Sequence, residues 1–191
     1  MYGLTSTGMS SPEPLDVDAV RPLPPIEIEH RFARAAVRGI RGMFEDYGVS
    51  IALASFDPAM ETMVPELFGR VAFIGSGIAG AVVLGASAGP LCRSRPDTTT
   101  EWDWIAELTN QLMGRIKNEM LRAGIQLQQS LPTVMDVDQL RTQAAGLRPW
   151  ILSASDGIVG LGIEIDVPAP ITPDAGLLNW DVPPEGELLL F

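Results

Sequence analysis

The chain has 191 residues, of which 46% are hydrophobic and 19% charged, so it can bury a substantial core and is not disordered throughout. Its formal net charge of −11 disfavours nucleic acid and anionic membranes as partners, because both attract Lys and Arg. A single cysteine, Cys92, and a single histidine, His30, exclude a disulfide framework and a zinc site built from several Cys and His ligands. We therefore expect a cytoplasmic protein.

Prolines are concentrated toward the two ends of the sequence, where apolar periodicity is lost. Residues 1–25 are rich in Ser, Thr and Pro, which predicts a flexible leader without the basic and apolar regions of a cleaved signal. Residues 168–191 are acidic and Pro-rich, and no Lys or Arg follows Arg148. We accordingly place one folded domain at 26–167, between a leader and an acidic tail.

The first helix is predicted from Glu27 to Tyr47, where apolar residues recur at helical spacing. These residues are Phe32, Ala36, Ile40, Met43, Phe44 and Tyr47. Gly48 ends the helix. The β-branched and apolar run from Val49 to Phe56 predicts a strand, and we interpret 57–69 as a linker with a helical turn.

The segment from Val71 to Cys92 carries no charged residue, and three interpretations of it compete. A membrane-spanning helix needs about 20 apolar residues, but glycines, serines and a proline interrupt this segment. A dinucleotide site is the second interpretation, because Gly75, Gly77 and Gly80 satisfy the pattern G-x-G-x-x-G. The long helix that such a site requires does not follow, since 81–90 is β-branched, Gly-rich and broken by proline.

The third interpretation, a β-hairpin that turns at Ser76 and Gly77, is favoured by an echo later in the chain. The sequence GIAG at 77–80 recurs as GIVG at 157–160, inside another strand-turn-strand pattern. The same offset of 80 residues places Glu27 on Glu107 and His30 on Asn110. We hypothesise an internal pseudo-twofold duplication of a helix followed by strands, with a chance match as the alternative.

The second long helix is predicted from Glu101 to Gly124, and its two faces differ in chemistry. One face is apolar and consists of Ile105, Leu108, Leu112, Ile116 and Met120. Glu107, Asn110 and Gly114 lie opposite, at spacings of three and four residues that stack them along the helix. This face offers another molecule a carboxylate and a carboxamide with a gap one turn later, and a merely solvated face is the alternative.

The remaining elements predict the fold class. The strand-like segment from Ile125 to Val137 follows the second helix, and a hairpin is predicted from Trp150 to Val167. Helices and strands alternate without regular βαβ spacing. We therefore expect an α+β fold with a mainly antiparallel sheet and two long helices packed on it.

Glu107, Asn110 and Gly114 form the pattern E-x-x-N-x-x-x-G, and the sequence SLPTV follows at 130–134. With the Gly-punctuated strands before the helix, these motifs resemble the CheC/CheX/FliY family of chemotaxis phosphatases, and CheX most closely. The resemblance covers about residues 27–167. It implies the family's α+β fold and a homodimer.

The resemblance also implies hydrolysis of the phospho-aspartate of a CheY-like response regulator. Glu107 and Asn110 would be the catalytic residues, with Asn110 orienting the attacking water and Glu107 binding the regulator's lysine. Gly114 would admit the partner, and the partner contacts on the same face would be Asp103, Lys117 and Leu121. The chain would hold no cofactor of its own, and Mg²⁺ would arrive with the regulator.

The sequence departs from the family in two places. The segment 88–100 is short and contains two prolines, so a helix that relatives often have there is expected to be missing. The positions for a second site on the first helix hold Glu27, His30 and Arg34, so we expect one site per chain. A non-catalytic adaptor with the same fold is the alternative function, and the sequence names neither the cognate regulator nor the role of the tail.

Overall fold

The computed structural model describes residues 21–54, 65–143 and 145–178 as an α+β fold, which confirms the predicted class. The helices are α1 (Pro25–Asp46), α2 (Ala88–Ser94), α3 (Glu101–Arg122), α4 (Val137–Gln143) and α5 (Ala175–Leu178). The strands are β1 (Ala52–Leu53), β2 (Leu67–Gly75), β3 (Ile78–Ala86), β4 (Gln128–Gln129), β5 (Thr133–Asp136), β6 (Arg148–Ala154) and β7 (Gly157–Asp166).

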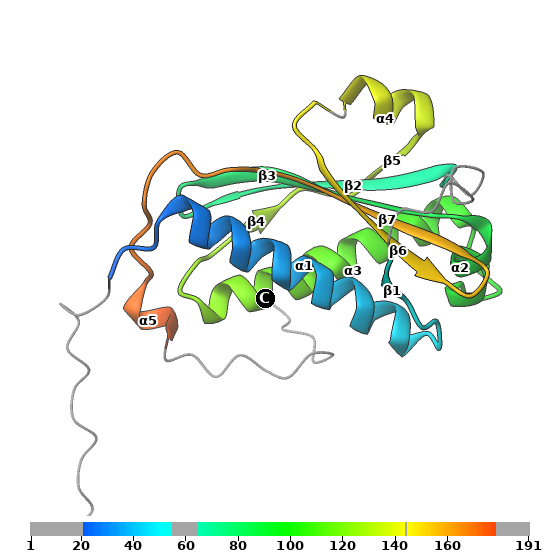
Figure 1. Ribbon diagram of the computed structural model, residues 1–191, viewed down its shortest axis with the longest axis horizontal. Helices are drawn as coiled ribbons and strands as arrows, with labels where there is room; N and C mark the ends of the chain where they lie inside the picture. The colour runs from blue at the N-terminus through cyan, green and yellow to red at the C-terminus, as the bar shows by residue number, and fades with distance from the viewer. Residues whose placement is uncertain (1–20, 55–64, 144, 179–191) are drawn as a thin grey trace, which may run out of the picture.

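The strands form one antiparallel sheet in the order β1-β6-β7-β3-β2-β4, with β5 also pairing with β2. The two long helices α1 and α3 lie next to each other on one face of this sheet, and α4 lies on the other face (Figure 1). None of the described helices is long and apolar enough to cross a membrane.

The core lies between the two long helices and the sheet. Phe32 of α1 stacks on Phe73 of β2, with ring centroids 4.7 Å apart. The helices approach closely at Gly39, where an added Cβ would lie 3.2 Å from the side chain of Leu112. The predicted apolar stripes of both helices are the buried ones, because side chains three and four residues apart share a face.

The uncharged segment is a β-hairpin over most of its length. Ser76 and Gly77, with φ of 49° and 78°, occupy the two central positions of the turn between β2 and β3, as a tight hairpin turn requires. The three glycines of G-x-G-x-x-G thus lie in and beside a hairpin turn, not between a strand and a helix. The hairpin prediction is confirmed, and the membrane-helix and dinucleotide interpretations of Val71 to Cys92 are wrong.

The two halves of the sheet are related reciprocally. Strands β3 and β7 pair with each other in the middle of the sheet, and their hairpin partners β2 and β6 lie on either side of them. One half of the sheet follows α1 and the other follows α3. Strand β1, after α1, pairs with β6 of the other half, and strands β4 and β5, after α3, pair with β2 of the first half. A pseudo-twofold axis between β3 and β7 accounts for this exchange. The duplication that would explain it stays a hypothesis.

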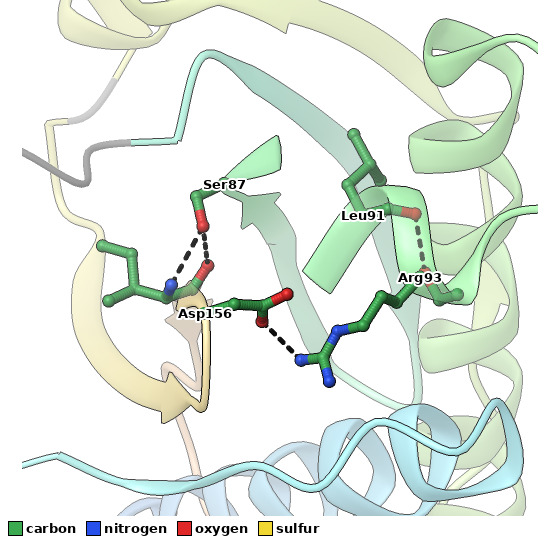
Figure 2. A network of polar contacts seen from close by, with 6 residues as sticks. Ser87, Leu91, Arg93 and Asp156 are labelled. Atoms are coloured by element: carbon green, nitrogen blue, oxygen red, sulfur yellow. Dashed lines mark hydrogen bonds and ion pairs between the residues drawn. The ribbon is translucent and has the colours of Figure 1, made fainter. Parts of the chain in front are cut away.

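The segment after β3 contains a short helix, so the expectation that 88–100 lacks one is wrong. Pro90 is the third residue of α2, where a backbone N–H has no helical partner to lose. Figure 2 shows Ser87 bonded to the backbone N–H and C=O of Ile158, and Arg93 paired with Asp156 at the β6–β7 turn. These contacts fix α2 to the second hairpin.

Three other segments differ from the sequence prediction. The strand expected from Val49 to Phe56 is only the two residues of β1, and 55–64 lies outside the described residues. The strand-like segment from Ile125 to Val137 divides into β4 and β5, and α4 follows it. Part of the expected tail packs on the domain, because Ile171 is 9% exposed and its N–H donates to the carbonyl of Leu23 at 3.0 Å.

Replacing Gly69 of β2 with alanine should destabilise the fold. An added Cβ would lie 2.8 Å from the carbonyl oxygen of Ile105 and 2.9 Å from Cβ of Thr109, so α3 would have to shift away from the strand. We expect the free energy of unfolding to fall by about 1–3 kcal/mol in chemical denaturation. Gly160→Ala is the matched control, since its Cβ would meet no atom closer than 3.9 Å. Equal stability of the two variants would contradict this packing.

Candidate functional site

The helix that carries the candidate site begins at a well-formed cap. The hydroxyl of Thr100 accepts a hydrogen bond from the backbone N–H of Asp103 at 3.1 Å, and it donates to the carboxylate of the same residue at 2.6 Å. Asp103 was predicted as a partner contact. It is exposed, but its carboxylate also stabilises the start of α3.

The burial of α3 separates its faces much as the spacing predicts. Leu108 and Thr109 are fully buried, whereas Glu107 is exposed and Asn110 is partly exposed. Asn110 lies toward the β4 edge of the sheet, where its side chain bonds to Gln129. The carboxylate and the carboxamide therefore share the accessible side of the helix.

Glu107 is held by a chain of polar contacts that reaches α1. The side-chain amide of Gln111 donates to Oε1 of Glu107 at 2.8 Å, and the hydroxyl of Tyr47 donates to Oε1 of Gln111 at 3.0 Å. The ring of Tyr47 packs edge-on against Trp104, whose indole N–H donates to Ser94 of α2. Because Oε2 of Glu107 has no bond from any described residue, it can accept one from a partner.

Asn110 is held from the sheet instead. Nε2 of Gln129, in β4, donates to Oδ1 of Asn110 at 2.7 Å. Nδ2 of Asn110 bonds to no other described residue, and no unbonded side-chain nitrogen or oxygen is buried in the described part of the chain. The amide nitrogen of Asn110 is therefore accessible to solvent.

The gap expected one turn after Asn110 is present. Apart from its own helix backbone and chain neighbours, a Cβ added to Gly114 would have no atom of a described residue within 4 Å. Lys117 and Leu121, predicted as further partner contacts on this face, are both partly exposed. The surface beside the Glu107–Asn110 pair is thus open to another molecule along about two helical turns.

The arrangement offers recognition and orientation rather than a nucleophile. It combines a carboxylate, which can bind a cation, with a carboxamide, which can both donate and accept hydrogen bonds. Among the described residues, no group of three or more His, Cys, Asp and Glu side chains could hold a metal ion. The expectation that any Mg²⁺ arrives with a partner stays a prediction.

The fold resembles solved structures of chemotaxis proteins. It matches the chemotaxis protein CheX of Vibrio vulnificus with a TM-score of 0.57 and 13% identity, over 71% of this chain and 96% of that one. The chain has the CheX fold. A CheC-like chemotactic protein of Shewanella oneidensis MR-1 matches with a TM-score of 0.52 and 11% identity, over 72% of this chain and 99% of that one.

A CheX protein of Desulfovibrio desulfuricans has the same TM-score of 0.52 at 12% identity, with 71% and 99% of the two chains covered. No family model and no curated protein matches the sequence. At these identities the likeness concerns the fold, and there it confirms the resemblance that the motifs predicted. The roles of Glu107 and Asn110 are not given by these matches.

Sequence reasoning missed the residues that hold the pair in place. Gln111 was detectable in principle, because it stands four residues after Glu107 on the same helix. Tyr47 and Gln129 were not detectable, because each contacts the site only in the folded structure and neither belongs to a motif. Tyr47 was assigned only to the apolar face of its helix.

Gly114→Ala should stabilise the isolated protein. Glycine in a helix interior costs roughly 0.5–1 kcal/mol relative to alanine, and here the new methyl group meets nothing. Urea denaturation should therefore show a higher midpoint with an unchanged slope. A lower midpoint would mean that this gap is needed by the fold itself.

Proposed function

We propose that the chain is a phosphatase that hydrolyses the phospho-aspartate of a CheY-like response regulator. The observation that carries the proposal is the placement of Glu107, Asn110 and Gly114 together on the accessible face of α3 in a CheX fold. The resemblance of the E-x-x-N-x-x-x-G motif to the phosphatase family suggests the reaction, and the CheX fold supports that resemblance. The proposal needs these residues as well as the fold, because proteins with one fold can have different functions.

The proposed reaction suits a surface without a nucleophile. An acyl phosphate is already activated, so hydrolysis needs an in-line water and a fixed geometry. The water oxygen bonds to phosphorus while the bond from phosphorus to the aspartate oxygen breaks, which releases inorganic phosphate and a free carboxylate. Asn110 would accept a hydrogen from the water and so hold its lone pair toward phosphorus.

The other residues would dock the regulator. Oε2 of Glu107 would accept a salt bridge from the regulator's lysine, while Gln111 keeps Oε1 in place. The open surface at Gly114 would let the regulator's backbone approach α3. Any Mg²⁺ would belong to the regulator's own site.

Asn110→Ala should remove most of the activity without unfolding the protein. We expect the rate of phosphate release at saturating phosphorylated regulator to fall about 100-fold, or ~2.7 kcal/mol of barrier. The measurement is phosphate release from a panel of acyl-phosphorylated regulators, with circular dichroism as the check on folding. Wild-type protein that accelerates release from no regulator would overturn the proposal.

Glu107→Ala should act mainly on docking. We expect KM for the regulator to rise about tenfold, because the variant loses the cation-binding carboxylate. Gly114→Ala should raise KM too, although it stabilises the chain, because its methyl group occupies the approach surface. An unchanged KM in both variants would place the regulator elsewhere on the protein.

A non-catalytic adaptor is the second candidate function. The observation in its favour is that both members of the pair already have hydrogen-bond partners within the chain, Gln111 and Gln129. An adaptor would bind the phosphorylated regulator through α3 and leave its phosphate lifetime unchanged. The same assay distinguishes the two, because binding without accelerated release supports only the adaptor.

The homodimer stays part of the proposal. The edge strand β1 pairs with Leu152 and Ser153 of β6, and the N–H of Ala54 donates to the carbonyl of Ile151, which leaves 148–150 of β6 without a described partner on this edge. A second copy could pair there. Light scattering at several concentrations would test it, and a monomer throughout would remove the dimer.

A further inference from the structure

We propose that Gln129 is a positioning residue that holds the Asn110 carboxamide in place for the attacking water. The inference rests on the proposed phosphatase function and deepens it. No motif contains Gln129, and it lies 19 residues after Asn110. The contact arises because β4 brings the sheet edge beside α3.

The backbone of Gln129 is fixed independently of its side chain. Gln129 pairs with Phe73 and Gln128 with Ile74 in the antiparallel ladder between β2 and β4. Ser130 then donates its N–H to the carbonyl of Ala72 at 2.9 Å. The Gln129 side chain therefore starts from a rigid edge and reaches Asn110 at 2.7 Å, whereas the neighbouring Gln128 is exposed.

The two ends of a carboxamide have opposite effects on a nucleophilic water. Oδ1 of Asn110 would accept a hydrogen from the water and leave its lone pair free for phosphorus. Nδ2 would instead donate to that lone pair and oppose the attack. Asn110 consequently has one productive and one unproductive orientation, and a hydrogen-bond partner at its other end keeps the carboxamide from rotating freely between them.

Gln129 can serve both orientations because it is itself a carboxamide. At present its Nε2 donates to Oδ1 of Asn110, and its own Oε1 accepts no bond from a described residue. A half-turn of both carboxamides reverses the bond, so that Nδ2 of Asn110 donates to Oε1 of Gln129. Oδ1 of Asn110 then faces solvent, where the water and the phosphoryl group would lie.

A side chain at position 129 without an amide cannot hold the Asn110 carboxamide in either orientation. Gln129→Met keeps the length of the side chain and the backbone pairing, and removes both the amide donor and the amide acceptor. Asn110 would then lose its partner and sample both orientations. We expect kcat for phosphate release to fall about tenfold, with KM for the phosphorylated regulator changed less than twofold.

The experiment compares Gln129→Met with Gln128→Met, the adjacent exposed position in the same strand, which should keep wild-type kcat. Gln129→Asn shortens the side chain but keeps its polarity, so it should show the same loss as Gln129→Met. Urea denaturation checks that each variant is folded. If Gln129→Met does not fold, kcat of Gln129→Asn tests the inference instead.

A double-mutant cycle distinguishes a role of Gln129 through Asn110 from a general effect of Gln129 on the structure. If Gln129 acts through Asn110, Gln129→Met should cause no further loss in an Asn110→Ala background. A tenfold loss in both backgrounds, or wild-type kcat in Gln129→Met, would overturn the inference.

The two proposals fail in different ways. Loss of activity in Asn110→Ala but not in Gln129→Met would leave the phosphatase standing and remove only the positioning role. Absence of phosphate release by the wild-type protein would remove both.

Discussion

The close approach of α3 to strand β2 determines where the candidate site lies. Gly69 has no side chain, and the fully buried Thr109 occupies the space that a Cβ would need. The hydroxyl of Thr109 is satisfied within the helix by the carbonyl of Ile105 at 2.6 Å, so it can be buried at little cost. With Thr109 pinned there, the next residue, Asn110, must emerge at the edge of the sheet, within reach of Gln129.

Local sequence periodicity was sufficient for the helix and its faces. The apolar spacing in α3 defines the buried stripe, and residues three or four positions apart on the other side share an accessible face because of helix geometry alone. Spacing could not reveal that β4 would lie beside that face. The bond between Asn110 and Gln129 depends on the register of β4 on β2, which no local pattern encodes.

The errors in the sequence prediction also have physical causes. Pro90 was interpreted as a helix breaker, yet within the first turn of α2 it sacrifices no hydrogen bond. The run after α1 predicted a long strand because its residues, Val49 and Ile51 among them, are apolar and β-branched. In the structure Val49 and Ile51 are buried in the core without strand pairing, and Ala52 and Leu53 are the described residues of this run that form the strand. Burial and strand formation produce the same apolar signal in a short segment.

The two long helices α1 and α3 lie next to each other on one face of the sheet (Figure 1), but among the described helices only α3 carries the features of the candidate site. The sequence offset of 80 residues matches Glu27 with Glu107, although Glu27 is the third residue of α1 and Glu107 the seventh of α3. The carboxylate of Glu27 accepts from Arg31 at 2.7 Å. The same offset matches Arg34 with Gly114, and Arg34 is exposed, so its positive charge would repel a partner's lysine. The difference between the two helices therefore lies in their side chains, because α3 has no side chain at Gly114 and α1 carries an arginine at the matched position.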